Sequence, residues 1–401
     1  MKEDKLIENI KSKTIFVDCD YEKYYPKSRL ITSLGNGTVV YVLNKDTKEW
    51  DNYINELYKS LCKIEKDVSL KEFTDHIYNL IRLNELNDFN SIKKYYEKRP
   101  MEEYNFLKIA YGMTVNDVNY VEYNGITLIK KEYIVEYLKE NFLDDEAVPF
   151  LYDNYIKTDD DIIYMKIKCI AKDNSKAQEY AIQRFKVIDI CFRFLLKKDN
   201  SNEIRIGFFN LNHESISGMF GYSKNTFVSV PEYKNSVNID KYINYLFESS
   251  ISKSVWSLME KKDLNDMEKR IKEAIIWISE ATHQNDDGIA YMQCFLALES
   301  LLMEQDGFIS KSITAQISEY VAFILSEEKI ERINIEKEIK RLYAIRSSIA
   351  HGKNKKDVYV EIEKIFGTVK SIVVKFLTDK KLMSVHNIQE LREYITDLKF
   401  E

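Results

Sequence analysis

The chain has 401 residues, of which 45% are hydrophobic and 13% aromatic, and its formal net charge is −6. This length exceeds what one typical hydrophobic core serves, so we expect two or three ordered domains. The negative charge argues against a protein that coats nucleic acid over a broad surface, although a local basic patch is compatible with it.

The sequence gives no sign of a membrane span, secretion or a cofactor. No apolar run approaches the roughly 18 residues that a membrane span needs, and the charged N-terminus lacks the apolar core of a signal peptide. The five cysteines are scattered and form no Cys-x-x-Cys pair. We therefore expect a cytoplasmic protein with reduced thiols, no metal and no other cofactor.

The first segment, residues 1–115, is expected to mix strands and helices. Residues 14–18 and 30–43 have the composition of strands, and Gly35-Asn36-Gly37 predicts a turn within the second. Helical patterns follow at 50–66, 70–84 and 101–112.

The second segment, residues 116–248, is also expected to be α/β and to have a sensing or regulatory role. Tyr123-Asn124-Gly125 predicts a hairpin that joins 118–122 to 126–130. The rest of the segment predicts a half-buried strand at 162–170, a long helix at 171–196, and strands at 203–211 and 226–230. A protein or a small molecule that binds the N-terminal region, residues 1–248, is the expected trigger.

The third segment, residues 249–401, has helical periodicity throughout. Apolar residues form stripes that begin at Leu264, Ile309 and Val358, and two further stripes contain Glu299 and Arg346. The expected fold is therefore α+β, in which a mixed α/β N-terminal region precedes an all-α antiparallel bundle of five amphipathic helices.

The strongest chemical signal is an Arg-x4-His pair, Arg346 and His351, near the end of one of these helices. Histidine moves protons near neutral pH, and arginine is a permanent cation that holds phosphate by two parallel hydrogen bonds. Cleaving RNA without a metal requires both functions. Gly352 predicts that the helix ends at His351, because glycine is typical of that position.

Arg346 lies on the apolar stripe of its helix, where an unpaired charge is costly. Glu299 occupies a similar position on the helix at about residues 291–303. Two opposite charges on the apolar faces of two helices predict an ion pair within the bundle.

Two motifs resemble the ApeA-like branch of the HEPN superfamily, namely Leu-Glu-Ser-Leu-Leu at 298–302 and Leu-Tyr-x-x-Arg-Ser-x-x-x-His-Gly at 342–352. The resemblance covers about residues 250–380. It implies a helical bundle that dimerises and a metal-independent ribonuclease that acts as a toxin or in defence against phage. It also implies that Arg346 and His351 are catalytic, with Ser347 at the position after the arginine.

The expected reaction is attack of an RNA 2′-hydroxyl on the adjacent phosphate. His351 would move the proton, and Arg346 would stabilise the developing charge. On an ideal helix these two residues are about 140° apart, so a two-fold dimer is expected to complete the site. Glu299 and Tyr343 are expected to support the site, and Arg341, Lys353, Lys355 and Lys356 are candidates for binding the RNA backbone.

Each of these interpretations has a simpler alternative. Arg346 and Glu299 could form a purely structural ion pair, and His351 could merely end its helix. Tyr343 could pack in the bundle instead of stacking on a base, and the basic residues could form a solvated face. The whole bundle could then be a non-catalytic module that dimerises and binds a partner.

Overall fold

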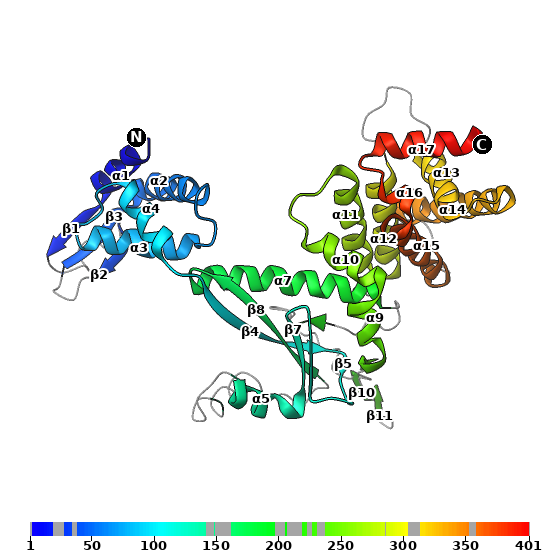
Figure 1. Cartoon of the computed structure of the whole chain (residues 1–401), viewed down its shortest axis with the longest axis horizontal. Helices are drawn as coiled ribbons and strands as arrows, with labels where there is room; N and C mark the ends of the chain where they lie inside the picture. Colours follow the sequence, from blue (N-terminus) through cyan, green and yellow to red (C-terminus); the bar gives the residue numbers. More distant parts are fainter. Residues whose placement is uncertain are drawn as a thin grey trace. The chain divides into compact units, whose positions relative to one another are not determined.

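The computed structural model describes residues 2–18, 28–33, 38–141, 148, 162–196, 205–206, 219–222, 227–230, 237–284, 286–303, 313–352 and 358–400 (Figure 1). The chain forms two compact units, one made of Met1–Phe106 with Ile167–Gln183 and one of Leu107–Lys166 with Arg184–Glu401. The chain thus passes between the units three times. Neither unit coincides with one of the continuous segments 1–115, 116–248 and 249–401. The α+β class is as expected.

The described part of the first unit contains a small antiparallel sheet, four complete helices and the beginning of a fifth at residues 174–183. Its sheet has the strand order β1-β3-β2, and Trp50, Leu57, Phe73 and Tyr96 are among the side chains buried in its core. The strands are β1 (Ile15–Asp18), β2 (Ser28–Ser33) and β3 (Thr38–Leu43), and the helices are α1 (Lys2–Lys13), α2 (Asn44–Cys62), α3 (Leu70–Arg82) and α4 (Phe89–Lys98).

Most of the elements expected in this unit are present. The predicted strands at 14–18 and 30–43 and the predicted helices at 50–66 and 70–84 are confirmed, while the expected turn at 35–37 lies outside the described residues. Helices α1 and α4 are additional. The side chain of Asp88 caps α4 by accepting a hydrogen bond from the Ser91 amide.

The helix predicted at 101–112 is wrong, because this segment forms the strand β4 (Glu102–Tyr111). Its aromatic and β-branched residues alternate along the chain as well as matching a helical period, so either structure suits the pattern. In the five-stranded sheet β4 lies between β8 (Ile162–Ala171) and β9 (Arg205–Ile206). Pairing with these distant strands decides in favour of the strand.

The five-stranded sheet has the order β6-β7-β8-β4-β9. The predicted hairpin is confirmed as β6 (Tyr120–Tyr123) and β7 (Ile126–Lys130), with left-handed φ values of 50° at Asn124 and 70° at Gly125 that suit an Asn-Gly turn. The strand at 162–170 is confirmed, but it is not half-buried as predicted. Residues 162–167 are all buried, so both faces of this part of β8 are covered.

The remaining elements of this region are short, apart from one long helix. The helix predicted at 171–196 is confirmed as α7 (Asn174–Leu195) and the strand at 226–230 as β11 (Phe227–Val230), which pairs with β10 (Met219–Tyr222). Of the strand expected at 203–211, the described residues contain only β9. The other elements are the helix α5 (Ile134–Asn141) and the strands β5 (Met113–Thr114) and β12 (Val237–Asn238). Strands β5 and β12 pair in parallel.

The C-terminal region is helical, as expected, and contains more helices than the five predicted (Figure 1). The three apolar stripes are confirmed by the burial of most of their described members, including Ile271, Tyr320 and Ile365. The helices are α9 (Ile243–Glu248), α10 (Ser250–Glu260), α11 (Asp266–Ala281), α12 (Asp287–Leu302), α13 (Ile313–Leu325), α14 (Lys329–Ala350), α15 (Val358–Thr378), α16 (Lys380–Met383) and α17 (Ile388–Phe400).

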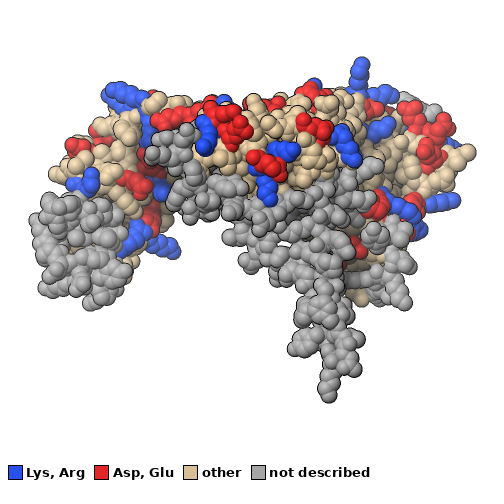
Figure 2. Space-filling view, turned by 90° about the horizontal axis from the view of Figure 1, so that it is seen from below, with Lys and Arg blue, Asp and Glu red and all other residues tan. Residues whose placement is uncertain are grey.

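Helix α12 is at the centre of this helical region, because it contacts α11, α13, α14 and α15. Its composition explains this position, since nine of its residues are buried. The surface around the two units is mixed in charge, and Figure 2 shows acidic and basic side chains interspersed on the described part of one face. None of the described helices is long and apolar enough to cross a lipid bilayer.

Candidate active site at the end of helix α14

Helix α14 carries both residues of the Arg-x4-His pair and is anchored in the bundle near its middle. Ile339 and Leu342 are its buried residues. The Tyr291 hydroxyl of α12 donates a 2.8 Å hydrogen bond to the Leu342 carbonyl oxygen. This anchor fixes the last two turns of α14 beside α12, where Arg346 and Glu299 meet.

The ion pair predicted between Arg346 and Glu299 is present. The Arg346 Nη2 atom lies 3.2 Å from Glu299 Oε1, and the two side chains are 24% and 18% exposed. Both charges are therefore half-buried, which makes their interaction stronger than that of a fully solvated pair.

Tyr343 completes this cluster from one turn earlier on α14. Its hydroxyl donates a 3.0 Å hydrogen bond to Glu299 Oε1, and the Arg346 guanidinium carbon lies 5.5 Å from the centre of its ring. Burial, followed by the negative charge of Glu299, raises the pKa of Tyr343. Tyr343 therefore stays protonated at neutral pH and remains a donor.

Tyr343 is also half-buried in the bundle. Its ring packs edge-on against Phe295 of α12, with 5.2 Å between the ring centres. This contact and the bond to Glu299 fix the ring within the protein, so its position favours packing over base stacking. Its contribution to a site is to hold Glu299 and to lie against Arg346.

Arg346 keeps unused hydrogen-bonding capacity within this cluster. Its Nε atom is buried and has no hydrogen-bond partner among the described residues. Because this atom is buried, a phosphate could contact the guanidinium only through the 24% of the side chain that is exposed.

His351 is the C-terminal capping residue of α14, and its side chain is exposed. Its amide donates a 3.1 Å hydrogen bond to the Ser347 carbonyl oxygen, and Gly352 follows with a φ of 70°. In the described part of the chain the imidazole has no hydrogen bond or ion pair. Its exposure at the helix end leaves the imidazole accessible to a substrate.

Arg346 and His351 do not converge within one chain. They are about 7.5 Å apart along the axis of an ideal helix and about 140° apart around it, and no described contact joins their side chains. Ser347 is half-buried and lies one helical turn before His351. The single chain thus places the two groups on different sides of one helix end.

Of the four proposed RNA-binding residues, the structure describes Arg341. Arg341 is held by two carboxylates, with Nη2 2.7 Å from Glu338 and 2.5 Å from Glu361, and these bonds raise its pKa. An RNA phosphate would have to compete with both carboxylates for Arg341. Lys353, Lys355 and Lys356 lie outside the described residues.

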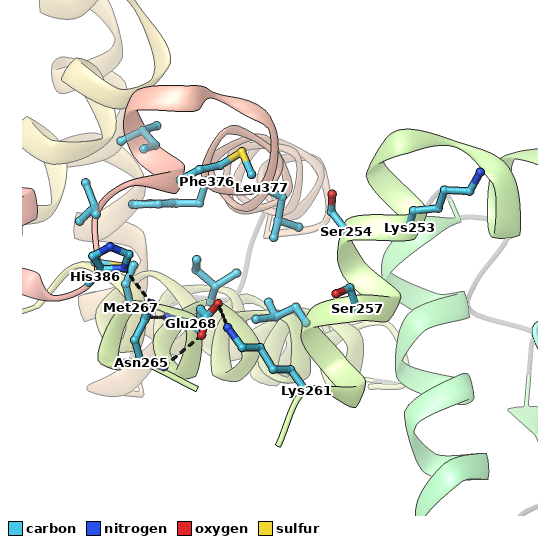
Figure 3. A pocket seen from close by; sticks show the side chains of 15 residues that line it. Lys253, Ser254, Ser257, Lys261, Asn265, Met267, Glu268, Phe376, Leu377 and His386 are labelled. Atoms are coloured by element: carbon cyan, nitrogen blue, oxygen red, sulfur yellow. Dashed lines mark hydrogen bonds and ion pairs between the residues drawn. The ribbon is translucent and has the colours of Figure 1, made fainter. Parts of the chain in front are cut away.

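A cavity of about 510 Å³ in the same helical region was not predicted. Figure 3 shows that Ser254 and Ser257 of α10 and Lys261, the residue after this helix, line one part of it and that Phe376 and Leu377 of α15 line another. Its lining mixes apolar side chains, such as Leu258 and Ile271, with polar ones, such as Asn265 and Glu268. The lining comes from the margins of several helices, so no motif in the sequence indicates it.

The comparisons with known proteins add no assignment. No protein-family model matches the chain, and no curated protein or solved structure is significantly similar to it. Among the described residues, no group of three or more histidine, cysteine or carboxylate side chains could hold a metal ion. A function for this site therefore rests on the chemistry of Arg346, His351 and their neighbours.

Proposed function

We propose that the protein is a metal-independent endoribonuclease of the HEPN type, acting as a toxin or as an effector of defence against phage. The observation that carries the proposal is the Arg346 guanidinium, which Glu299 and Tyr343 hold in place while 24% of its side chain remains exposed. The exposed His351 on the same helix end supplies the second chemical function. The role in toxicity or defence rests on the family resemblance of the two motifs.

In the proposed reaction an RNA 2′-oxygen attacks the neighbouring phosphorus while His351 accepts the proton of the 2′-hydroxyl. The new 2′-O–P bond replaces the P–O5′ bond, and an imidazolium returns a proton to the departing 5′-oxygen. Arg346 stabilises the additional negative charge on the phosphorane. The products are a 2′,3′-cyclic phosphate and a 5′-hydroxyl, so DNA, which lacks the nucleophile, is not cleaved.

A homodimer completes this site. Because Arg346 and His351 point to different sides of α14, a phosphate near one Arg346 needs the His351 of another chain. A two-fold axis near the end of α14 supplies two such combinations. The alternative, a bundle that only dimerises and binds a partner, uses the same surface without chemistry.

Expression toxicity in bacteria tests the proposal. The wild-type chain should arrest growth, whereas Arg346→Ala and His351→Ala should not, because each removes one chemical function. Arg392→Ala, at an arginine on α17, is a control that should remain toxic. All variants must be present at equal amounts in soluble form. Equal toxicity of wild type and His351→Ala would support the non-catalytic alternative.

A further inference from the structure

A second surface with the chemistry of nucleic-acid binding lies on α4 of the first unit. Three exposed residues, Lys94, Tyr95 and Lys98, define this α4 face. On an ideal helix they fall within an arc of about 100°, and the two lysines are one turn, about 6 Å, apart. The opposite side of α4 is anchored in the core by Phe89, Ile92 and Tyr96.

Tyr95 is held rigidly although 45% of its surface is exposed. Its ring centre lies 4.0 Å from that of His76 on α3 and 5.0 Å from that of Tyr96, which meets it edge-on. His76 is itself fixed, since its Nδ1 atom is 3.1 Å from the Tyr96 hydroxyl. An exposed aromatic ring fixed by two neighbours offers a preformed platform for a base.

The charges around Tyr95 leave the two lysines uncompensated. Arg99 is paired with Glu72, and Lys93 lies 3.4 Å from Glu97. Neither Lys94 nor Lys98 forms an ion pair within the described part of the chain. Asp88, the N-cap residue, accepts hydrogen bonds from the Ser91 hydroxyl and amide, which together with the nearby charge of Lys94 lower its pKa.

We propose that the α4 face binds single-stranded RNA, with Tyr95 stacking on one base and Lys94 and Lys98 contacting phosphates. This inference rests on the proposed ribonuclease function, for which the α4 face would retain substrate. Stacking on an aromatic ring together with lysine contacts to the backbone is the usual mode of sequence-tolerant single-strand binding. Bases paired in a duplex are not free to stack on Tyr95, so the α4 face prefers single strands.

The test uses full-length chain with His351→Ala, so that the RNA is not cut, and a fluorescein-labelled single-stranded RNA dodecamer. Anisotropy titrations between 50 and 200 mM salt give the affinity and its salt dependence. Tyr95→Ala should weaken binding about 5- to 150-fold with an unchanged salt dependence, because it removes stacking and no charge. Tyr95→Phe keeps the ring and should bind like the parent.

The double variant Lys94→Gln/Lys98→Gln should change the salt dependence instead. Loss of two phosphate contacts lowers the magnitude of the slope of log K against log salt by about 1.4. Lys262→Gln/Lys269→Gln removes the same charge from two exposed lysines of the second unit and should leave the slope unchanged. Circular dichroism of each variant confirms that it is folded.

The proposal would be overturned if Tyr95→Ala and Lys94→Gln/Lys98→Gln bound the RNA like the parent. It would also be overturned if Lys94→Gln/Lys98→Gln and Lys262→Gln/Lys269→Gln changed the slope equally. Absence of RNA binding by the parent would also overturn it. Failure of the proposed function looks different, because the wild-type chain would then not cleave RNA while the α4 variants still alter binding.

Discussion

At the residue scale, the central observation is that Arg346 is positioned by its neighbours and not only by its helix. Glu299 contacts its guanidinium, and Tyr343 both bonds to Glu299 and lies against Arg346. The contact between Arg346 and Glu299 could be predicted because each charge interrupts an apolar stripe. Tyr343 was expected to support the site, but its hydrogen bond to Glu299 could not be predicted, because its spacing in the sequence suits packing or base stacking and names no partner.

Replacement of Glu299 should show how far the cluster stabilises the fold. Glu299→Gln keeps the shape but removes the charge that faces Arg346, so we expect a loss of about 1 kcal/mol in the free energy of unfolding. Glu336→Gln is the matched control, because Glu336 pairs with Lys340 on the exposed part of α14. The control should cost less than about 0.5 kcal/mol. Urea unfolding measures both, and equal losses would mean that the cluster contributes no more than a surface pair.

At the element scale, the sequence predicts best those elements whose own pattern decides their structure. The apolar stripes of α11, α13 and α15 contain Ile271, Tyr320 and Ile365, which are all buried. The pattern within each helix is enough to predict which of its faces is buried. Strand β4 was missed because its pairing with β8 and β9 depends on residues far away in the chain. Local periodicity contains no information on such partners.

The junction of α7 with α15 shows how a single side chain joins two elements. Lys370 of α15 donates 3.0 Å hydrogen bonds to the carbonyl oxygens of Leu195 and Leu196, at the end of α7. Burial lowers the pKa of Lys370 to about 8. Burying the charged ammonium group therefore costs free energy, and this cost falls as the pH rises and the group loses its proton.

This cost predicts a pH dependence of stability. Between pH 8 and the unfolded value of 10.5, the unfolded chain binds more protons at this site than the folded chain, so the contribution of Lys370 to stability rises with pH. The gain is at most about 1.4 kcal/mol per pH unit. Unfolding of wild type and Lys370→Met should show it as a difference that grows from pH 8 to 9.5. A constant difference would contradict the lowered pKa.

At the scale of the whole molecule, the proposed ribonuclease site needs a second chain to bring a His351 to Arg346. The sequence indicates this through the angular spacing on α14, but a single sequence does not specify how two copies meet. The dimer interface therefore cannot be derived from the periodicity that revealed the bundle.

Mixing two inactive variants tests the composite site. If Arg346 of one chain works with His351 of the other, a heterodimer of Arg346→Ala and His351→Ala contains one complete set. Mixed subunits should regain part of the wild-type ribonuclease activity, while each variant alone stays inactive. Light scattering of the full chain should show a dimer. A monomer at high concentration, or no regained activity after verified subunit exchange, would contradict a site shared between chains.

Cleavage of single-stranded RNA by the purified chain in EDTA tests the central claim most directly. Wild type should cleave RNA but not DNA of the same sequence, and mass spectrometry should find 2′,3′-cyclic phosphate ends. His351→Ala should reduce the rate by about 10² to 10⁴, the usual contribution of a general acid–base group. Full activity of folded His351→Ala, or activity that EDTA abolishes and Mg²⁺ restores, would contradict the account.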